Sequence, residues 1–240
     1  INISDFSYGI YIDSTIRANI NDVDIRSVTT NAVFLGSDRH RLINCYCDYC
    51  GDVTVLDGRI IRVDGDYNEL INCSVTEYKT LVNGTPCGIY IAGDNNTLNN
   101  CFVSGAIGVA PTHHIGIHVA GQAVTITNCR VFDIPGIALN FAAASVGPHY
   151  IYGFECYATA TTASYAIQIE GGETFFSDLV CESGTDGALY AVASCSTNNA
   201  HIYTAAPMAV AYLTRFGAGE HRISNSTLNG GNVSQDSFVT

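Results

Sequence analysis

A period of 28 residues restricts what this chain can fold into more than any other feature of its sequence. Cysteines recur at this interval, and an asparagine precedes each of them: Cys45, Cys73, Cys101 and Cys129. The strand-like strings AVFL, IIRV, GIYI and GIHV share the period and end at Leu35, Val63, Ile91 and Val119. Self-similarity at such a period indicates a solenoid, in which each repeat forms one coil that stacks on the next.

Each repeat reads as short strands joined by turns. Within Val124–Val131 apolar residues alternate, stop at Asn128 and resume, which favours two short strands and a tight turn. Related phrases lie in both directions: Gly9–Ile12, Gly136–Leu139, Ala166–Ile169 and Ala188–Ala191, with a degenerate last turn at Met208–Leu213 and His221–Leu228. The sequence therefore predicts an all-β fold, a single-stranded right-handed parallel β-helix of about nine coils. We expect one domain over residues 1–240, and a strand-like start at Ile1 suggests a piece of a longer chain.

Composition supports a folded chain and argues against two classes of partner. Of the 240 residues, 47% are hydrophobic and 13% charged, which is enough apolar material for a sizeable core. The formal net charge of -12 repels phosphate backbones, so we expect no nucleic acid partner. No apolar run reaches the length of a membrane helix, so we expect no membrane insertion.

The repeated Asn-Cys pair predicts two columns along the solenoid. Asparagine tolerates a left-handed turn conformation, and its amide can bond the asparagines above and below it. The following cysteine points inward, and we expect Cys73, Cys101 and Cys129 to be buried free thiols. A zinc site in Cys45–Cys50, or a metal site in His113, His114 and His118, is the less favoured alternative.

The repeat also predicts a line of outward side chains at the centre of one strand per coil. These residues are Tyr11, Phe34, Arg62, Tyr90, His118, Gln168 and Tyr190. Aromatic rings on a flat strand surface suit sugars, because the apolar face of a pyranose stacks on them. Burial of the same rings between subunits is an equal alternative.

Acidic residues occupy the turn that follows this strand: Asp38, Asp66 and Asp94, with Gln122 next in register. They are either solvated turn residues or members of a catalytic pair, since glycosidases need two carboxyl groups about 5 to 5.5 Å or about 6.5 to 9.5 Å apart. The candidate catalytic residues are Asp64, Asp66, Asp94, Glu170 and Glu173. A lyase would instead bind calcium on Asp64, Asp66 and Asp94, with Arg62 as the base. No other cofactor is expected.

The strings GIYIAGDNNTLNNCFV and GIHVAGQAVTITNCRV resemble the pectate-lyase-like β-helix superfamily, most of all the bacteriophage tailspikes and related polysaccharide depolymerases. The resemblance implies a homotrimer on a virion or in the extracellular space that binds or cleaves a surface polysaccharide. The Asn-Thr-Asp, Asp-Asp, Gly-His-Gly and Arg-x-Lys phrases of polygalacturonases are absent, and a chain with no Trp lacks the tryptophan-containing signature of pectate lyases.

Three classes of function remain open at this stage. The chain is a glycan depolymerase, a non-catalytic receptor-binding adhesin or a structural segment of a fibre. For the first two we expect the sugar to bind across Arg62, Tyr90 and His118, with Tyr190 further along the same face.

Overall fold

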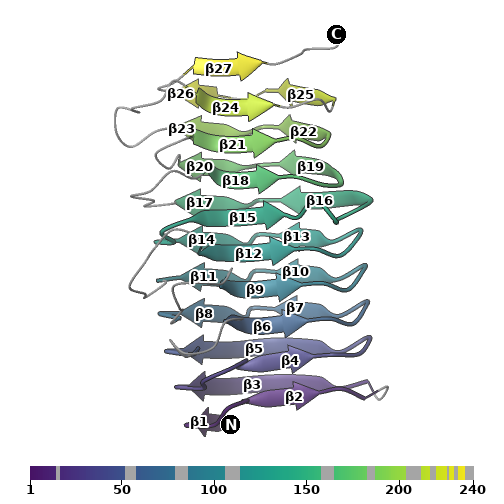
Figure 1. Ribbon diagram of the computed structural model, residues 1–240, viewed down its shortest axis with the longest axis vertical. Coiled ribbons are helices and arrows are strands. Elements are labelled where there is room, and N and C mark those ends of the chain that lie inside the picture. Colours follow the sequence, from purple (N-terminus) through teal and green to yellow (C-terminus); the bar gives the residue numbers. More distant parts are fainter. Residues whose placement is uncertain are drawn as a thin grey trace.

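The computed structural model describes residues 1–14, 17–51, 58–78, 86–105, 114–157, 165–182, 187–203, 212–216, 220–225, 227–229 and 232–235. Its regular elements are strands in parallel pairs, stacked coil upon coil along one axis from the N-terminal to the C-terminal end (Figure 1). The predicted all-β parallel β-helix is confirmed. None of the described residues belongs to a helix long and apolar enough to cross a membrane.

Two sheets form the walls of the solenoid. Described strands of the 10-stranded sheet are β2 (Ile10–Ile12), β4 (Val33–Leu35), β6 (Arg59–Val63), β9 (Cys87–Ile91), β12 (Ile115–Val119), β15 (Ile137–Phe141), β18 (Tyr165–Ile169), β21 (Gly187–Ala191), β24 (Tyr212–Phe216) and β27 (Asn232–Gln235). Described strands of the 17-stranded sheet are β1 (Asn2–Ser4), β3 (Asn19–Arg26), β5 (Arg41–Asp48), β7 (Glu69–Ile71), β8 (Ser74–Thr76), β10 (Thr97–Asn99), β11 (Phe102–Ser104), β13 (Thr125–Thr127), β14 (Arg130–Phe132), β16 (Pro148–Tyr152), β17 (Glu155–Tyr157), β19 (Glu173–Ser177), β20 (Val180–Glu182), β22 (Cys195–Asn198), β23 (His201–Tyr203), β25 (His221–Ser224) and β26 (Thr227–Asn229).

The register of the 10-stranded sheet agrees with the predicted outward line except in one coil. Arg62 pairs with Tyr90 and Tyr90 with His118, as the 28-residue period requires. The alignment of Gly136–Leu139 with the earlier strands was wrong by two residues, because the step to the next coil falls from 28 to 22 residues between His118 and Asn140. Asn140 therefore takes the position after His118.

The inward columns form the core. All ten cysteines are buried and none forms a disulfide bond, which confirms the predicted buried thiols at Cys73, Cys101 and Cys129. Cys101 and Cys129 occupy consecutive coils, and the Cys101 backbone N–H lies 3.4 Å from Cys129 Sγ. Burial and the neighbouring thiol Cys129 raise the pKa of Cys101, with the neighbour as the larger cause, so the thiol stays protonated at neutral pH.

Asparagines stack at the corner between the paired short strands of the 17-stranded sheet. Asn72 and Asn100 have φ angles of 52° and 54°, in the left-handed region. The Asn72 amide donates to Asn44 Oδ1 at 3.1 Å, and the Asn100 amide donates to Asn72 Oδ1 at 2.8 Å. The predicted amide ladder is confirmed over these three coils. We call this line of residues the corner column.

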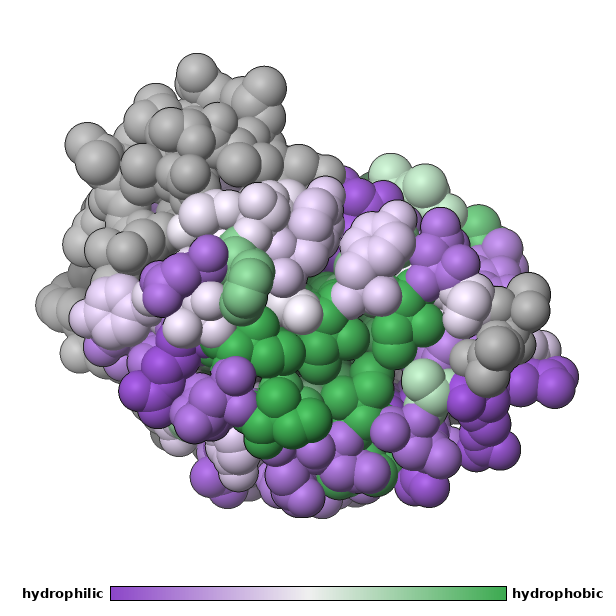
Figure 2. All heavy atoms as spheres, turned by 90° about the horizontal axis from the view of Figure 1, so that it is seen from below, coloured by the Kyte–Doolittle hydropathy of each residue, from purple (hydrophilic) through white to green (hydrophobic). Residues whose placement is uncertain are grey.

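The core is less covered at the N-terminal end of the solenoid. Seen along the axis from that end, apolar residues occupy the centre of the face and hydrophilic residues surround them (Figure 2). Ile3, Ile10, Ile12 and Ile20 pack against the core but are only partly buried. Burial of each coil therefore depends on the coils stacked on either side of it.

The corner column yields a test that separates backbone strain from amide bonding. In Asn72→Gly the amide bonds to Asn44 and Asn100 are lost but the positive φ is tolerated, whereas Asn72→Ala also bears the steric cost of the left-handed conformation. We expect the alanine variant to unfold with a free energy about 1 kcal/mol below that of the glycine variant. Urea unfolding of both variants measures the difference, and equal stabilities would contradict it.

Candidate functional site

Rings and guanidinium groups line up on the outer surface of the 10-stranded sheet. The Tyr11 and Phe34 rings stack with centroids 4.7 Å apart, and Arg62 Cζ lies 5.4 Å from the Phe34 centroid. Tyr90 and His118 stack at 5.3 Å. Parallel register places equivalent side chains about 4.8 Å apart, which is close to a stacking distance. We call Tyr11, Phe34, Arg62, Tyr90 and His118, together with Arg59, the outer ladder.

Arg59 is a member that the sequence interpretation missed. Its Cζ atom lies 3.7 Å from the centre of the Tyr90 ring, a close cation–π contact. The repeat identified in the sequence covers only the last four residues of the string RIIRV, and Arg59 is the residue just before them. A five-residue phrase would have found a second cation in this coil.

Arg62 is held by an acidic neighbour. Its Nε atom lies 2.9 and 3.0 Å from the two Asp64 carboxylate oxygens, and its Nη2 atom lies 2.6 Å from Oδ2. Both side chains are half-buried, so this paired geometry is firmer than that of an exposed ion pair. Arg62 and Asp64 therefore lie close together as predicted, but they form an ion pair with each other. A guanidinium so paired is poorly placed to act as the base of a lyase.

His118 carries no charge at neutral pH. Burial, assisted by the nearby Arg59 guanidinium, lowers its pKa to about 4. A neutral imidazole has one N–H donor and one acceptor nitrogen, which suits it to a hydroxyl group. The outer ladder thus ends in a ring that can both donate and accept a hydrogen bond.

The turn aspartates bond to the backbone of the next coil. Asp66 Oδ1 accepts the N–H of Asp94 at 2.7 Å, and Asp94 Oδ1 accepts the N–H of Gln122 at 2.8 Å. Asp38 accepts the N–H of Asp66 in the same way at 2.8 Å. Each carboxylate thus satisfies a turn N–H that has no strand partner. The sequence interpretation considered solvation, a cation or a catalytic pair, and missed this role.

Stacked glycines explain why Gly precedes Asp in these turns. A Cβ atom on Gly93 would lie 2.0 Å from the Gly65 carbonyl oxygen, and one on Gly121 would lie 2.0 Å from the Gly93 oxygen. Only glycine permits so close an approach of backbones between coils. The compressed turn brings each aspartate within reach of the next coil.

The remaining candidates lie further along the solenoid. Glu170 and Glu173 flank the turn between β18 and β19, both exposed, and Glu170 Oε1 accepts the Gln168 amide at 2.6 Å. Tyr190 stacks on Tyr165 at 5.1 Å. Asn140 and Gln168 stand between His118 and Tyr190 in the register, so Tyr190 does not join Arg62 and Tyr90.

Geometry gives no support to a metal centre. Over the described part of the chain, no three His, Cys, Asp or Glu side chains converge in a way that could hold a metal ion, and this includes Asp64, Asp66 and Asp94. His113 lies outside the described residues, so the histidine group cannot be assembled from them.

The coil arrangement defines a right-handed parallel β-helix, and a comparison with known families gives the same result. The family described as right handed beta helix region matches residues 1–161, and the chain belongs to this family. No curated protein and no solved structure matches the chain significantly. Family membership identifies the scaffold, and function must be argued from the surface.

The lowered pKa of His118 makes the stability of the protein depend on pH. An unfolded chain binds a proton on this imidazole near its ordinary pKa of about 6.5, whereas the native state binds it only near 4. As pH falls through this window, the unfolded state takes up the proton first and the native state loses stability. Burial gives His149 the same tendency, with a pKa of about 4.

We therefore expect His118→Gln to lose less stability than the unsubstituted protein between about pH 7 and about pH 5. His149 is present in both proteins and should preserve part of the dependence of stability on pH. Urea unfolding at the two pH values measures the effect, and a ring-proton NMR titration gives the pKa directly. A His118 midpoint near 6.5 would rule out this explanation.

Proposed function

We propose that this chain recognises a surface polysaccharide that lies along the solenoid axis on the outer ladder. The observation that carries the proposal is the succession of stacked rings and guanidinium groups over five consecutive strands, β2, β4, β6, β9 and β12. Four coil steps of about 4.8 Å give the ladder a length of about 19 Å. A repeating polymer matches a repeating surface, because successive sugar units meet equivalent positions.

The side chains of the ladder offer the contacts that a sugar needs. Tyr11 is 55% exposed and presents its ring to solvent. Its ring suits the apolar face of a pyranose, and the imidazole of His118 suits hydroxyl groups. Arg59 covers one face of Tyr90, so at that coil the sugar would meet guanidinium donors and the ring edge.

Recognition is better supported than hydrolysis at the predicted acids. A glycosidase needs one carboxyl group that carries a proton and a second that faces the sugar or a water molecule. Asp64 is paired with Arg62, while Asp66 and Asp94 each use an oxygen to accept a backbone N–H. These contacts indicate that the three carboxylates stabilise the fold. Glu170 and Glu173 remain the candidate pair for a depolymerase.

The setting that we propose is that of a tailspike or a related adhesin. This setting comprises an extracellular or virion-surface location and a homotrimer of solenoids. It rests on the resemblance of the repeat strings to tailspike β-helices, together with the lengthwise ladder. Light scattering of the purified chain tests the trimer, and a stable monomer at micromolar concentration would count against it.

Tyr11→Ala tests the ladder with a matched control. Tyr11 and Tyr46 are 55% and 53% exposed, and Tyr46 lies on β5 in the other sheet. We expect Tyr11→Ala to weaken binding to capsular or lipopolysaccharide preparations by about tenfold, the loss of one ring contact, and Tyr46→Ala to leave binding unchanged. Isothermal titration measures both. Equal effects of the two substitutions, or none, would place the binding surface elsewhere.

Asp94→Asn tests whether the turn acids act in cleavage. The asparagine keeps an oxygen that can accept the Gln122 N–H, so the turn should persist. We expect this variant to bind polysaccharide, and to release reducing ends, to the same extent as the native chain. Release of reducing ends by the native chain and its loss in Asp94→Asn would establish hydrolysis instead of recognition alone.

A further inference from the structure

The corner column is interrupted at one coil. Described residues with positive φ continue it past Asn128 as Gly153, Asp178, Asn199 and Asn225. Backbone bonds confirm the alignment, since the Asn128 N–H donates to the Tyr152 oxygen and the Gly153 N–H to the Ser177 oxygen. Gly153 is the one member of this series without a side chain, and it leaves a gap between Asn128 and Asp178.

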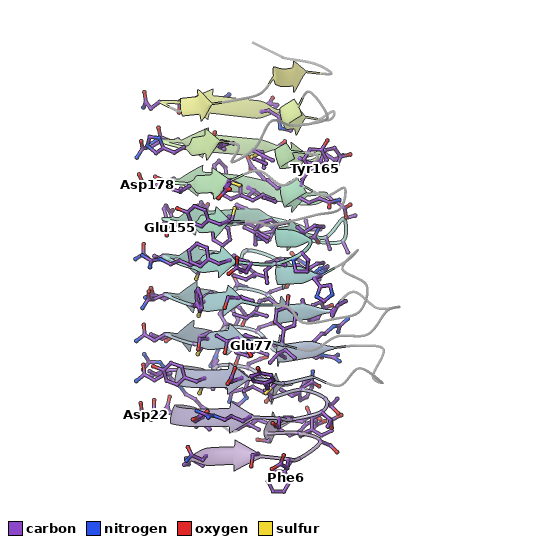
Figure 3. The ribbon with its side chains drawn as sticks, turned by 90° about the vertical axis from the view of Figure 1, so that its left-hand side faces the viewer. Phe6, Asp22, Glu77, Glu155, Tyr165 and Asp178 are labelled. Carbon is purple, nitrogen blue, oxygen red and sulfur yellow. The ribbon has the colours of Figure 1, made fainter. Side chains whose placement is uncertain are left out.

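A groove of about 370 Å³ opens at this gap. Its corner side is formed by Asn100, Asn128, Gly153 and Asp178, and its other side by Arg130, Glu155 and His201 from the strands that follow the corner. Figure 3 shows Glu155 and Asp178 projecting from the same edge of the solenoid, on adjacent coils, away from Tyr165 of the 10-stranded sheet. The groove shares no residue with the outer ladder.

The polar groups of the groove are arranged as neighbouring donors and acceptors. Arg130 Nε lies 3.2 Å from Glu155 Oε2, and both side chains are partly exposed. Asp178 accepts hydrogen bonds from the Asn199 amide and, at 2.9 Å, from the Ser177 hydroxyl. A Cβ atom added to Gly153 would lie 2.5 Å from Asn128 Oδ1, so the Asn128 oxygen faces the position of the missing side chain. The groove thus contains one exposed amide beside charged groups that already have partners.

This chemistry excludes several ligand classes and fits one. A bare cation would face the Arg130 guanidinium, and an anion would face the Glu155 and Asp178 carboxylates. Val180 is the only aliphatic side chain of the lining, so the groove offers little to an apolar ligand. A hydroxyl group both donates and accepts, and adjacent hydroxyls can meet a carboxylate and an amide or guanidinium together.

We propose that the groove at Gly153 binds a neutral saccharide unit. The missing side chain provides the space, and Asn128, Glu155, Arg130 and Asp178 provide the hydrogen bonds. This site goes beyond the recognition proposed for the outer ladder, because it lies on another surface and neither site needs the other.

Gly153→Asn is the sharpest test, because it fills the groove with the residue that the column uses elsewhere. The φ angle of 62° at Gly153 is one that asparagine tolerates, as Asn72 and Asn100 show. A Cβ atom there would approach Asn128 Oδ1 at 2.5 Å, so the Asn128 amide must rotate, and it then meets a new amide partner. We expect the variant to fold, because asparagine adopts the same conformation at Asn72 and Asn100 and the atom in the way is the end of a side chain that can rotate.

The binding assay uses the full chain with glucose, galactose, mannose and N-acetylglucosamine as probes, and with glucuronate and Ca²⁺ as charged comparators. Saturation-transfer NMR and isothermal titration should show at least one neutral sugar binding with a millimolar dissociation constant. Gly153→Asn should weaken that binding by at least about tenfold. Glu155→Gln, which keeps the shape of the groove, should weaken it by a smaller factor.

Two control variants separate this site from the rest of the molecule. Asn72→Gly replaces asparagine by glycine on the corner column, three coils away from Gly153. This variant should leave sugar binding unchanged. Tyr11→Ala should also leave it unchanged, whereas it weakens polysaccharide binding at the outer ladder. The proposal is overturned if no neutral sugar binds, if Gly153→Asn binds as well as the native chain, or if only glucuronate or Ca²⁺ binds.

Discussion

The parallel backbone hydrogen bonds between coils are the constraint on which the rest of this structure depends. They hold each residue of one coil about 4.8 Å from its equivalent in the next. Side chains that stabilise one another when identical or similar residues are in contact therefore form columns. The amides of Asn44, Asn72 and Asn100 do so by hydrogen bonding. The Tyr11 and Phe34 rings gain by stacking in the same way. Both the corner column and the outer ladder follow from this one spacing.

The same spacing is unfavourable for like charges, and the turn aspartates show how the chain deals with it. Carboxylates stacked at this distance repel one another. Asp66 and Asp94 are instead each bonded to a backbone N–H of the following coil. Stacked glycines shorten the turn and make this reach possible. A line of acids that resembles a catalytic or metal-binding row on the sequence is therefore explained by turn geometry.

The sequence predicted the pairs that follow from the period, and it missed one change of spacing and the contacts whose partner is a backbone group. The pairing of Arg62, Tyr90 and His118 followed from the 28-residue interval alone. Asn140 was missed because one coil is shorter by six residues, 22 instead of 28, and no side-chain pattern marks the change. The role of Asp94 was missed because its partner is the N–H of Gln122, and a backbone group leaves no trace in residue identity. The contact of Arg59 with Tyr90 depends on a side-chain path between coils, which spacing does not specify.

Repetition and its interruption give the solenoid two kinds of surface. Along the outer ladder, equivalent positions recur coil after coil, so a ligand gains from being long and periodic itself. At Gly153 the corner column loses one side chain, and the resulting gap lies between Asn128 and Asp178. A gap of one side chain favours a single sugar unit over a polymer, because the side chains of the corner column resume on either side of it. A saccharide chain that leaves the outer ladder would have to turn a corner of the solenoid to reach it, so the two surfaces are best suited to separate ligands.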